Sequence, residues 1–201
     1  MTQFNLNTIP FKNRCADISD WAIARNLIKG SNPAAQALKL LEELGEAAGA
    51  IARLPAAKLS GDAQRISDIR NTAMDGIGDT AVVLVIWLAQ LGYSAPTFTP
   101  SLIYADNTGQ RALRIMVELG KAAEYVEHFL MDADAPSMEN MAYTASSNDK
   151  AYLHIMRTFY HLSIWAVQIG CTLDECMRIT WYHIKDRRGK MVDGIFVKEG
   201  D

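Results

Sequence analysis

Two acidic clusters on predicted helices are the residues of this chain best suited to chemistry. Glu42, Glu43 and Glu46 lie inside the run LKLLEELGEAAGAIARL, and Asp75 and Asp79 lie just before the apolar run TAVVLVIWLAQLG. Acids three or four residues apart share one face of a helix, so two such faces brought together would gather several carboxylates. Because carboxylates repel each other and resist desolvation, a fold that gathers them usually holds a hard cation, which can in turn hold phosphates.

The first cluster is expected on a helix over residues 33–54. At about 100° per residue, one stripe of this helix should face the core; it consists of Ala37, Leu41, Leu44, Ala48 and Ile51. A second stripe lies on another side, and it consists of Gln36, Lys39, Glu43 and Glu46. Glu42 lies further round towards solvent, which makes Glu43 and Glu46 the better candidates for a site at the rim of the core.

The second cluster precedes a helix that is apolar nearly all round and therefore central. Asp75 and Asp79 share a face of it, and an unpaired carboxylate beside so many apolar residues is costly. Gly76 and Gly78 have no side chain, and two glycines this close in a helix indicate that a ligand or another helix approaches the backbone there. The alternative for both clusters is a solvated face or acids that complement a helix dipole.

The ligands of a cation here would be oxygen atoms only, since no His or Cys lies near these acids in the sequence. Oxygen ligands favour Mg²⁺ or Mn²⁺ over Zn²⁺. A diiron carboxylate bundle needs two Glu-x-x-His pairs, which the chain lacks. The densest basic cluster, Lys185 to Lys190, either stabilises a helix C-terminus or clamps a triphosphate.

The elements that must position these residues are almost all helical, so we predict an all-α helical bundle. The expected helices are 21–28, 33–54, 68–91, 109–131, 149–169 and 172–188, with loops at 55–67, 95–100 and 132–148. Asp193-Gly194 suits a type I′ turn and predicts a short hairpin over 190–198.

An internal repeat divides the chain. EELGEAA at 42–48 resembles VELGKAA at 117–123, and IWLAQLGYS at 86–94 resembles IWAVQIGCT at 164–172, at offsets of 75 and 78. We interpret this as a duplicated helical hairpin. Within one domain, 1–201, residues 20–94 form the acid-bearing repeat, 95–108 a linker, 109–188 a degenerate repeat plus last helix, and 189–201 a tail. The second copy has lost acids, because Lys121 replaces Glu46 and Arg157 stands at the position of Asp79.

Composition sets broad limits. A net charge of −3 argues against a binder of nucleic acid or of anionic membranes. The longest apolar run, 81–89, is far short of the roughly 20 residues that span a bilayer. The N-terminus does not resemble a signal peptide, and three cysteines without Cys-x-x-Cys spacing read as reduced core residues. We therefore expect a cytoplasmic protein.

These motifs resemble those of the all-α nucleoside triphosphate pyrophosphohydrolases, the MazG-like group related to dimeric dUTPases. The resemblance includes Q-x-x-K-x-x-E-E-x-x-E, which is Gln36, Lys39, Glu42, Glu43 and Glu46 here, the downstream Gly78-Asp79, the segment WAIARNLI at 21–28, and the tail IKDRRGKMVDGIFVKE at 184–199. It implies Mg²⁺-dependent hydrolysis of an NTP or dNTP to the monophosphate and pyrophosphate.

By position in these motifs, the resemblance implies metal ligands and phosphate contacts. The metal ligands would be Glu43, Glu46 and Asp79, helped by Asp75, with Glu42 or Glu46 to accept a proton. The substrate contacts would be Gln36, Lys39, Lys185 and Arg188. The chain departs from the family at two positions: Gly76 occupies a position that is usually Glu, and Tyr182 one that is usually Asn.

The rival interpretation is a degenerate helical protein that binds nucleotides without turnover or serves only as a structural oligomer. Gly76 and the loss of acids from the second repeat favour it. The repeat would make one chain a pseudo-dimer, while a further two-fold homodimer stays open.

Overall fold

The computed structural model describes residues 9–93, 107–133, 138–192 and 195–199 and is almost entirely helical. Its elements are α1 (Ile9–Ala24), α2 (Pro33–Ser60), α3 (Ala63–Gln90), α4 (Thr108–Ala133), α5 (Met138–Gln168), α6 (Leu173–Ile184), β1 (Gly189–Val192) and β2 (Ile195–Lys198). The two strands pair antiparallel, with Val192 opposite Ile195. The predicted all-α character and the C-terminal hairpin are confirmed; the Asp193-Gly194 turn itself lies outside the described residues.

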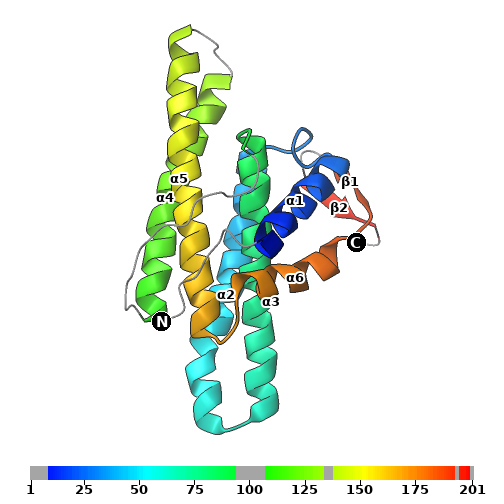
Figure 1. Ribbon diagram of the computed structural model, residues 1–201, viewed down its shortest axis with the longest axis vertical. Helices are drawn as coiled ribbons and strands as arrows, with labels where there is room; N and C mark the ends of the chain where they lie inside the picture. Colours follow the sequence, from blue (N-terminus) through cyan, green and yellow to red (C-terminus); the bar gives the residue numbers. More distant parts are fainter. Residues whose placement is uncertain (1–8, 94–106, 134–137, 193–194, 200–201) are drawn as a thin grey trace.

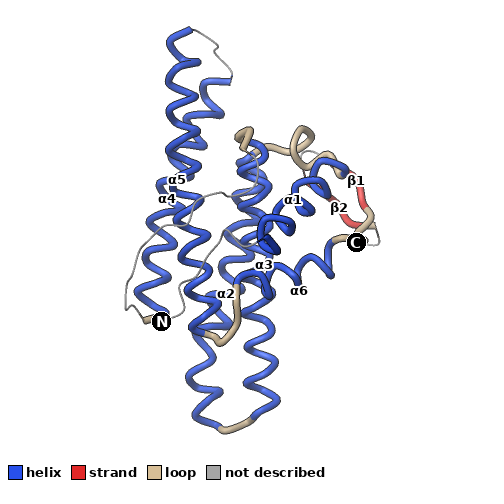
Figure 2. Tube along the Cα trace, in the orientation of Figure 1, coloured by secondary structure: helices blue, strands red, loops and turns tan. Residues whose placement is uncertain are grey.

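Two long helical hairpins dominate the structure (Figure 1). α2 packs along α3, and α4 packs along α5, while α1 and α6 lie against α3 on the side away from α4. The tube in Figure 2 shows the two strands as a small appendage beside α1. As expected, α3 is central: every residue from Thr80 to Leu88 is buried. By length and hydropathy α3 resembles a membrane span, but 78% of its most apolar window is buried inside the protein, as in a core helix.

Several predicted helix ends were wrong. α1 ends at Ala24 rather than beginning near Trp21, and α2 continues through Pro55 to Ser60. Proline in a helix loses one backbone hydrogen bond. Burial of Leu54 and Ala57 compensates and holds the last turn of α2 in place.

The polar stretches 55–67 and 132–148 are also more helical than predicted. α3 begins at Ala63 because Asp62 caps it, accepting a hydrogen bond from the Arg65 backbone N–H at 3.0 Å. α4 extends to Ala133, and α5 begins at Met138. The predicted linker at 95–100 lies outside the described residues.

The core stripe predicted for α2 was only partly right: Ile51 is buried, and Ala37, Leu44 and Ala48 are partly buried against the core. The buried side chains of α2 are those of Pro33, Gln36, Leu40, Glu43, Ala47, Ala50, Ile51, Leu54 and Ala57. Leu41 is 66% exposed, whereas Glu43 is only 6% exposed. The reason is close helix packing: a Cβ on Gly76 of α3 would lie 2.8 Å from the backbone nitrogen of Ala47. Small residues must occupy this contact, so Leu41 turns outwards, whereas Leu40 and Leu54 are buried.

The two hairpins share several hydrogen bonds at equivalent places. Trp87 in α3 donates from Nε1 to the Pro33 carbonyl at 2.9 Å, and Trp165 in α5 donates from Nε1 to the Thr108 carbonyl at 3.0 Å. Each bond ties the end of the second helix of a hairpin to the start of the first.

The helix ends match in the same way. Asn32 accepts a hydrogen bond from the Ala35 backbone at 2.9 Å, and Asn107 accepts one from the Gln110 backbone at 2.9 Å. The second helix of each hairpin is followed by a glycine in the left-handed region, at φ 87° for residue 92 and φ 83° for residue 170.

Candidate functional site

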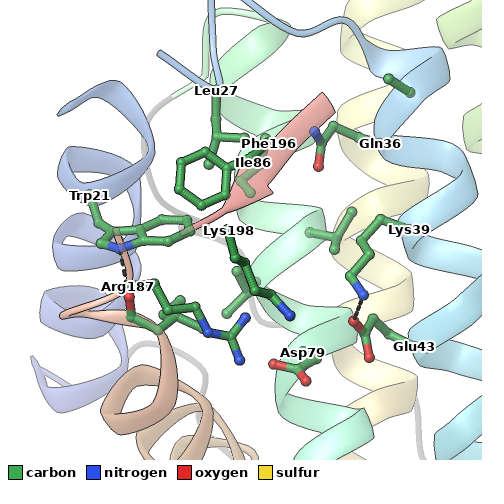
Figure 3. A pocket seen from close by; sticks show the side chains of 14 residues that line it. Trp21, Leu27, Gln36, Lys39, Glu43, Asp79, Ile86, Arg187, Phe196 and Lys198 are labelled. Atoms are coloured by element: carbon green, nitrogen blue, oxygen red, sulfur yellow. Dashed lines mark hydrogen bonds and ion pairs between the residues drawn. The ribbon is translucent and has the colours of Figure 1, made fainter. Parts of the chain in front are cut away.

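A cavity of about 160 Å³ lies where α1, α2, α3 and the C-terminal segment meet. Its lining comprises Trp21, Leu27, Ala35, Gln36, Lys39, Glu43, Asp79, Val82, Val83, Ile86, Ile184, Arg187, Phe196 and Lys198. Figure 3 shows the acids and Lys39 towards one end and the aromatic rings towards the other. The cavity is thus divided into a charged part and an apolar part, a common arrangement for a site that takes an amphipathic small molecule.

Glu43 is the buried acid of the charged end. Its carboxylate lies 2.6 Å from the ammonium of Lys39, which also pairs with exposed Glu42 at 2.8 Å. Burial alone would lower the pKa of Lys39, but the hydrogen bonds to the two glutamates raise it. This lysine therefore stays protonated and balances the charge of Glu43 inside the cavity.

Asp79 faces Glu43 from α3. Burial, together with the charges of Glu43 and Asp75, raises the pKa of Asp79 to about 7, against opposition from a Thr180 hydrogen bond and the Arg187 charge. A carboxyl with such a pKa exchanges its proton near neutral pH. Burial is the main reason that this carboxyl keeps its proton to near neutral pH, and the neighbouring acids add to the effect.

α6 packs against α3 beside the acidic cluster, and its last residue, Ile184, lines the cavity. Its Thr180 hydroxyl lies 3.4 Å from the Asp75 carbonyl oxygen, and His183 Nδ1 lies 3.1 Å from the Asp75 carboxylate. Gly78 permits this approach, because a Cβ there would lie 2.5 Å from the Cys176 carbonyl oxygen. Both glycines of the DGIGD cluster are thus explained by helix contacts, Gly76 with α2 and Gly78 with α6.

The segment after α6 is held by α1. Trp21 donates from Nε1 to the Ile184 carbonyl at 2.9 Å. Arg25 donates to the carbonyl of Lys185 at 3.0 Å and twice to that of Arg187, at 2.9 and 2.7 Å. These bonds satisfy carbonyls at the end of α6 and fix the backbone of Arg187, whose side chain lines the cavity.

The apolar end depends on the hairpin. The ring of Phe196 lies 6.4 Å from that of Trp21, inclined at 58°. Lys198, two residues further along β2, lines the same cavity, since alternate residues of a strand share a face. The hairpin thus contributes both an aromatic wall and a cation.

The structure brings only some of the predicted site residues together. Gln36, Lys39, Glu43 and Asp79 line the cavity. Gln36 also donates a hydrogen bond to the Ser31 hydroxyl at 3.0 Å.

Other predicted site residues lie outside the cavity lining. Glu46 is exposed one turn from Glu43, and Asp75 faces α6. Lys185 lies 3.5 Å from the Asp186 carboxylate and over the Tyr182 ring, and Arg188 is exposed. The cations of the C-terminal segment that line the cavity are Arg187 and Lys198, not the predicted Lys185 and Arg188.

Within the described residues, no group of three or more His, Cys, Asp or Glu side chains is arranged to hold a metal ion. The oxygen donors nearest to such a group are Glu43 and Asp79, which come from two helices and share one cavity. Comparison with family models, curated proteins and solved structures finds no match to this chain.

Proposed function

We propose that the protein is a Mg²⁺-dependent nucleoside triphosphate pyrophosphohydrolase of the MazG-like kind, which converts an NTP or dNTP to the monophosphate and pyrophosphate. The observation that carries the proposal is the shared lining of one cavity by Glu43 and Asp79, with three cations around them and two aromatic rings beyond. A nucleotide has the matching polarity, because its phosphates are anionic and its base is a flat, largely apolar ring.

The residues present fit a hard cation by their chemistry. Glu43 and Asp79 offer oxygen donors only. After burial, the charge of Glu43 is the next largest cause of the raised pKa of Asp79, and a divalent cation between the two carboxylates would relieve that repulsion. We assign Mg²⁺, or Mn²⁺, to these two carboxylates, with Asp75 and Glu46 at the margin. When bound, the ion would neutralise phosphate charge and lower the pKa of a coordinated water.

The other side chains of the cavity would bind the phosphates and the base of the substrate. Lys39, Arg187 and Lys198 lie where they can bind phosphate oxygens, since ammonium and guanidinium groups form strong charge-assisted hydrogen bonds with them. Trp21 and Phe196 offer faces for the base. Water then attacks phosphorus and pyrophosphate leaves, with Glu42 or Glu46 on α2 to accept the proton.

We further propose that the two hairpins are degenerate copies of one unit, as in a pseudo-dimer. The equivalent Trp–carbonyl bonds, asparagine caps and terminal glycines support this proposal. At the place of the acidic site, the second hairpin has Glu118 at 2.6 Å from His154 Nδ1 and 3.8 Å from Arg157. There a histidine and an arginine of the protein itself contact the carboxylate, so the second copy would serve as scaffold.

Turnover of a nucleotide panel tests the function. Canonical and deoxy nucleoside triphosphates would be incubated with and without Mg²⁺ and the products separated by anion exchange. We expect Mg²⁺-dependent monophosphate and pyrophosphate, lost in Glu43→Gln and in Asp79→Asn. Asp68→Asn, which removes an exposed carboxylate from the same helix as Asp79, is the control and should retain activity.

The rival function is nucleotide binding without turnover, and one observation favours it: the Lys39–Glu43 ion pair occupies a carboxylate that the metal needs. Binding of the nucleotides to the intact chain, with no product from any of them in Mg²⁺ or Mn²⁺, would establish this rival and reject the hydrolase.

A further inference from the structure

Two cysteines face each other at the start of α6. Cys171 Sγ lies 3.6 Å from Cys176 Sγ, and Cys171 Sγ also lies 3.3 Å from the Ala166 carbonyl oxygen. Both thiols are buried, Cys171 at 8% exposure and Cys176 at 0%. Cys15 is a third free cysteine, buried in the core.

The local fold holds the two thiols in this arrangement. Thr172 is the N-cap of α6 and forms a capping box with Glu175, with bonds of 2.7 and 3.1 Å. Cys171 therefore precedes the N-cap and Cys176 is the fourth residue of the helix. These are the two positions that pack together as a hydrophobic staple at helix N-termini. The contact between the sulfurs is thus a consequence of the cap, and it persists as long as the cap does.

We propose that Cys171 and Cys176 form an oxidation site that a hydroperoxide converts to an intramolecular disulfide. The sulfurs must approach from 3.6 Å to about 2.05 Å. The movement falls mainly on Cys171, because it lies in the turn between α5 and α6. Cys176 is less free to move, since its carbonyl oxygen packs against Gly78 of α3.

The attacking sulfur is that of Cys171. The hydrogen bond from the Cys176 thiol, aided by the charge of Arg70 and opposed by burial, lowers the pKa of Cys171. Arg70 is fixed nearby, because it donates to the Ile169 carbonyl at 2.8 Å and to the Gly170 carbonyl at 2.6 Å. A thiolate near a cation and a helix N-terminus is the reactive form of cysteine.

The reaction balances in two steps. The Cys171 thiolate attacks one oxygen of hydrogen peroxide, the O–O bond breaks, and the departing hydroxide takes a proton to become water, leaving a sulfenic acid. The Cys176 sulfur then attacks the Cys171 sulfur, the S–O bond breaks, and a second water leaves with the thiol proton. The two thiols lose two electrons, and the peroxide is reduced to two waters.

Mass spectrometry of the peroxide-treated full chain tests the proposal. After denaturation and alkylation, we expect one alkylated cysteine, Cys15, and a tryptic peptide 158–178 that is two hydrogens lighter than its reduced form. Met116, which is 64% exposed, serves as an internal control for exposure to oxidant. Oxidation of Met116 with all three cysteines still alkylated would overturn the proposal, as would a disulfide that includes Cys15.

Two variants test whether Cys176 is the residue that resolves the sulfenic acid of Cys171, apart from any effect of a substitution on folding. In Cys176→Ser, Cys171 should stop at the sulfenic acid and become labelled by dimedone, while Cys15→Ser should still form the disulfide. Dimedone labelling of wild type equal to that of Cys176→Ser would show that Cys176 does not resolve the sulfenic acid. None of these readouts depends on hydrolase activity.

Discussion

Replacing Asp79 with asparagine should stabilise the protein, and the gain should grow with pH. Asp79 is partly buried, and burial with neighbouring acids raises its pKa from 3.8 to about 7 in the folded state. The folded protein therefore binds this proton more tightly than the unfolded chain does. Stability falls as pH rises from about 4 to about 7 and then levels off. Asparagine has nearly the same shape and does not ionise.

The magnitude follows from the shift. About three pKa units at 1.36 kcal/mol each mean that ionised Asp79 lowers the free energy of unfolding of wild type by at most about 4 kcal/mol at pH 8. At pH 5 the same effect is only about 2 kcal/mol. The free energy of unfolding, measured by urea denaturation without divalent cations, should favour Asp79→Asn by these amounts. Asp68→Asn on the same helix is exposed and should change stability by less than about 0.5 kcal/mol at both pH values. A gain for Asp79→Asn that is the same at pH 5 and pH 8, or a loss at pH 8, would show that folding does not raise the pKa of Asp79.

Two further pairs of substitutions test the packing and the charge balance around the cavity. Gly76→Ala should lower the free energy of unfolding by about 1–2 kcal/mol, because overpacking against Ala47 outweighs the helix propensity gained. Gly45→Ala, where a Cβ meets nothing within 4 Å, should instead raise it by about 0.5–1 kcal/mol in the same urea titration, and equal effects would contradict the close packing. Lys39→Met should cost about 1–3 kcal/mol by leaving buried Glu43 unpaired, and adding Glu43→Gln should restore much of the loss. A double variant as unstable as the sum of the two singles would show that Lys39 and Glu43 are not coupled.

Periodicity predicted the helical class, the central place of α3 and the C-terminal hairpin correctly, because these rest on long patterns. It misjudged the rotation of α2 in part, at Leu41 above all, since an apolar stripe is normally the core face. Here the contact between Gly76 and Ala47 sets the rotation instead, and that contact joins two helices. Only the pairing of the helices decides which of two stripes turns inwards.

The candidate site shows the same limit. Glu43 and Asp79 could be found from their spacing and their apolar surroundings. Phe196 and Lys198 lie in the tail segment 184–199, which is part of the family resemblance, but no spacing or charge pattern singled out these two residues. Their place in the cavity depends on how α1 anchors the end of α6, through Trp21 and Arg25. An aromatic residue and an arginine four apart would have been a usable signal, since they share a helix face and can bind carbonyls together.

Binding of a Mg²⁺–nucleotide complex would show whether the cavity between Glu43 and Asp79 holds the phosphates. Thermal denaturation of wild type would be compared with Glu43→Gln and Asp68→Asn in Mg²⁺ alone and in Mg²⁺ with each nucleoside triphosphate. We expect that Mg²⁺ raises the Tm of wild type and of Asp68→Asn, that nucleotide raises it further, and that Glu43→Gln loses both effects. Equal stabilisation of all three proteins, or stabilisation of none, would contradict this expectation.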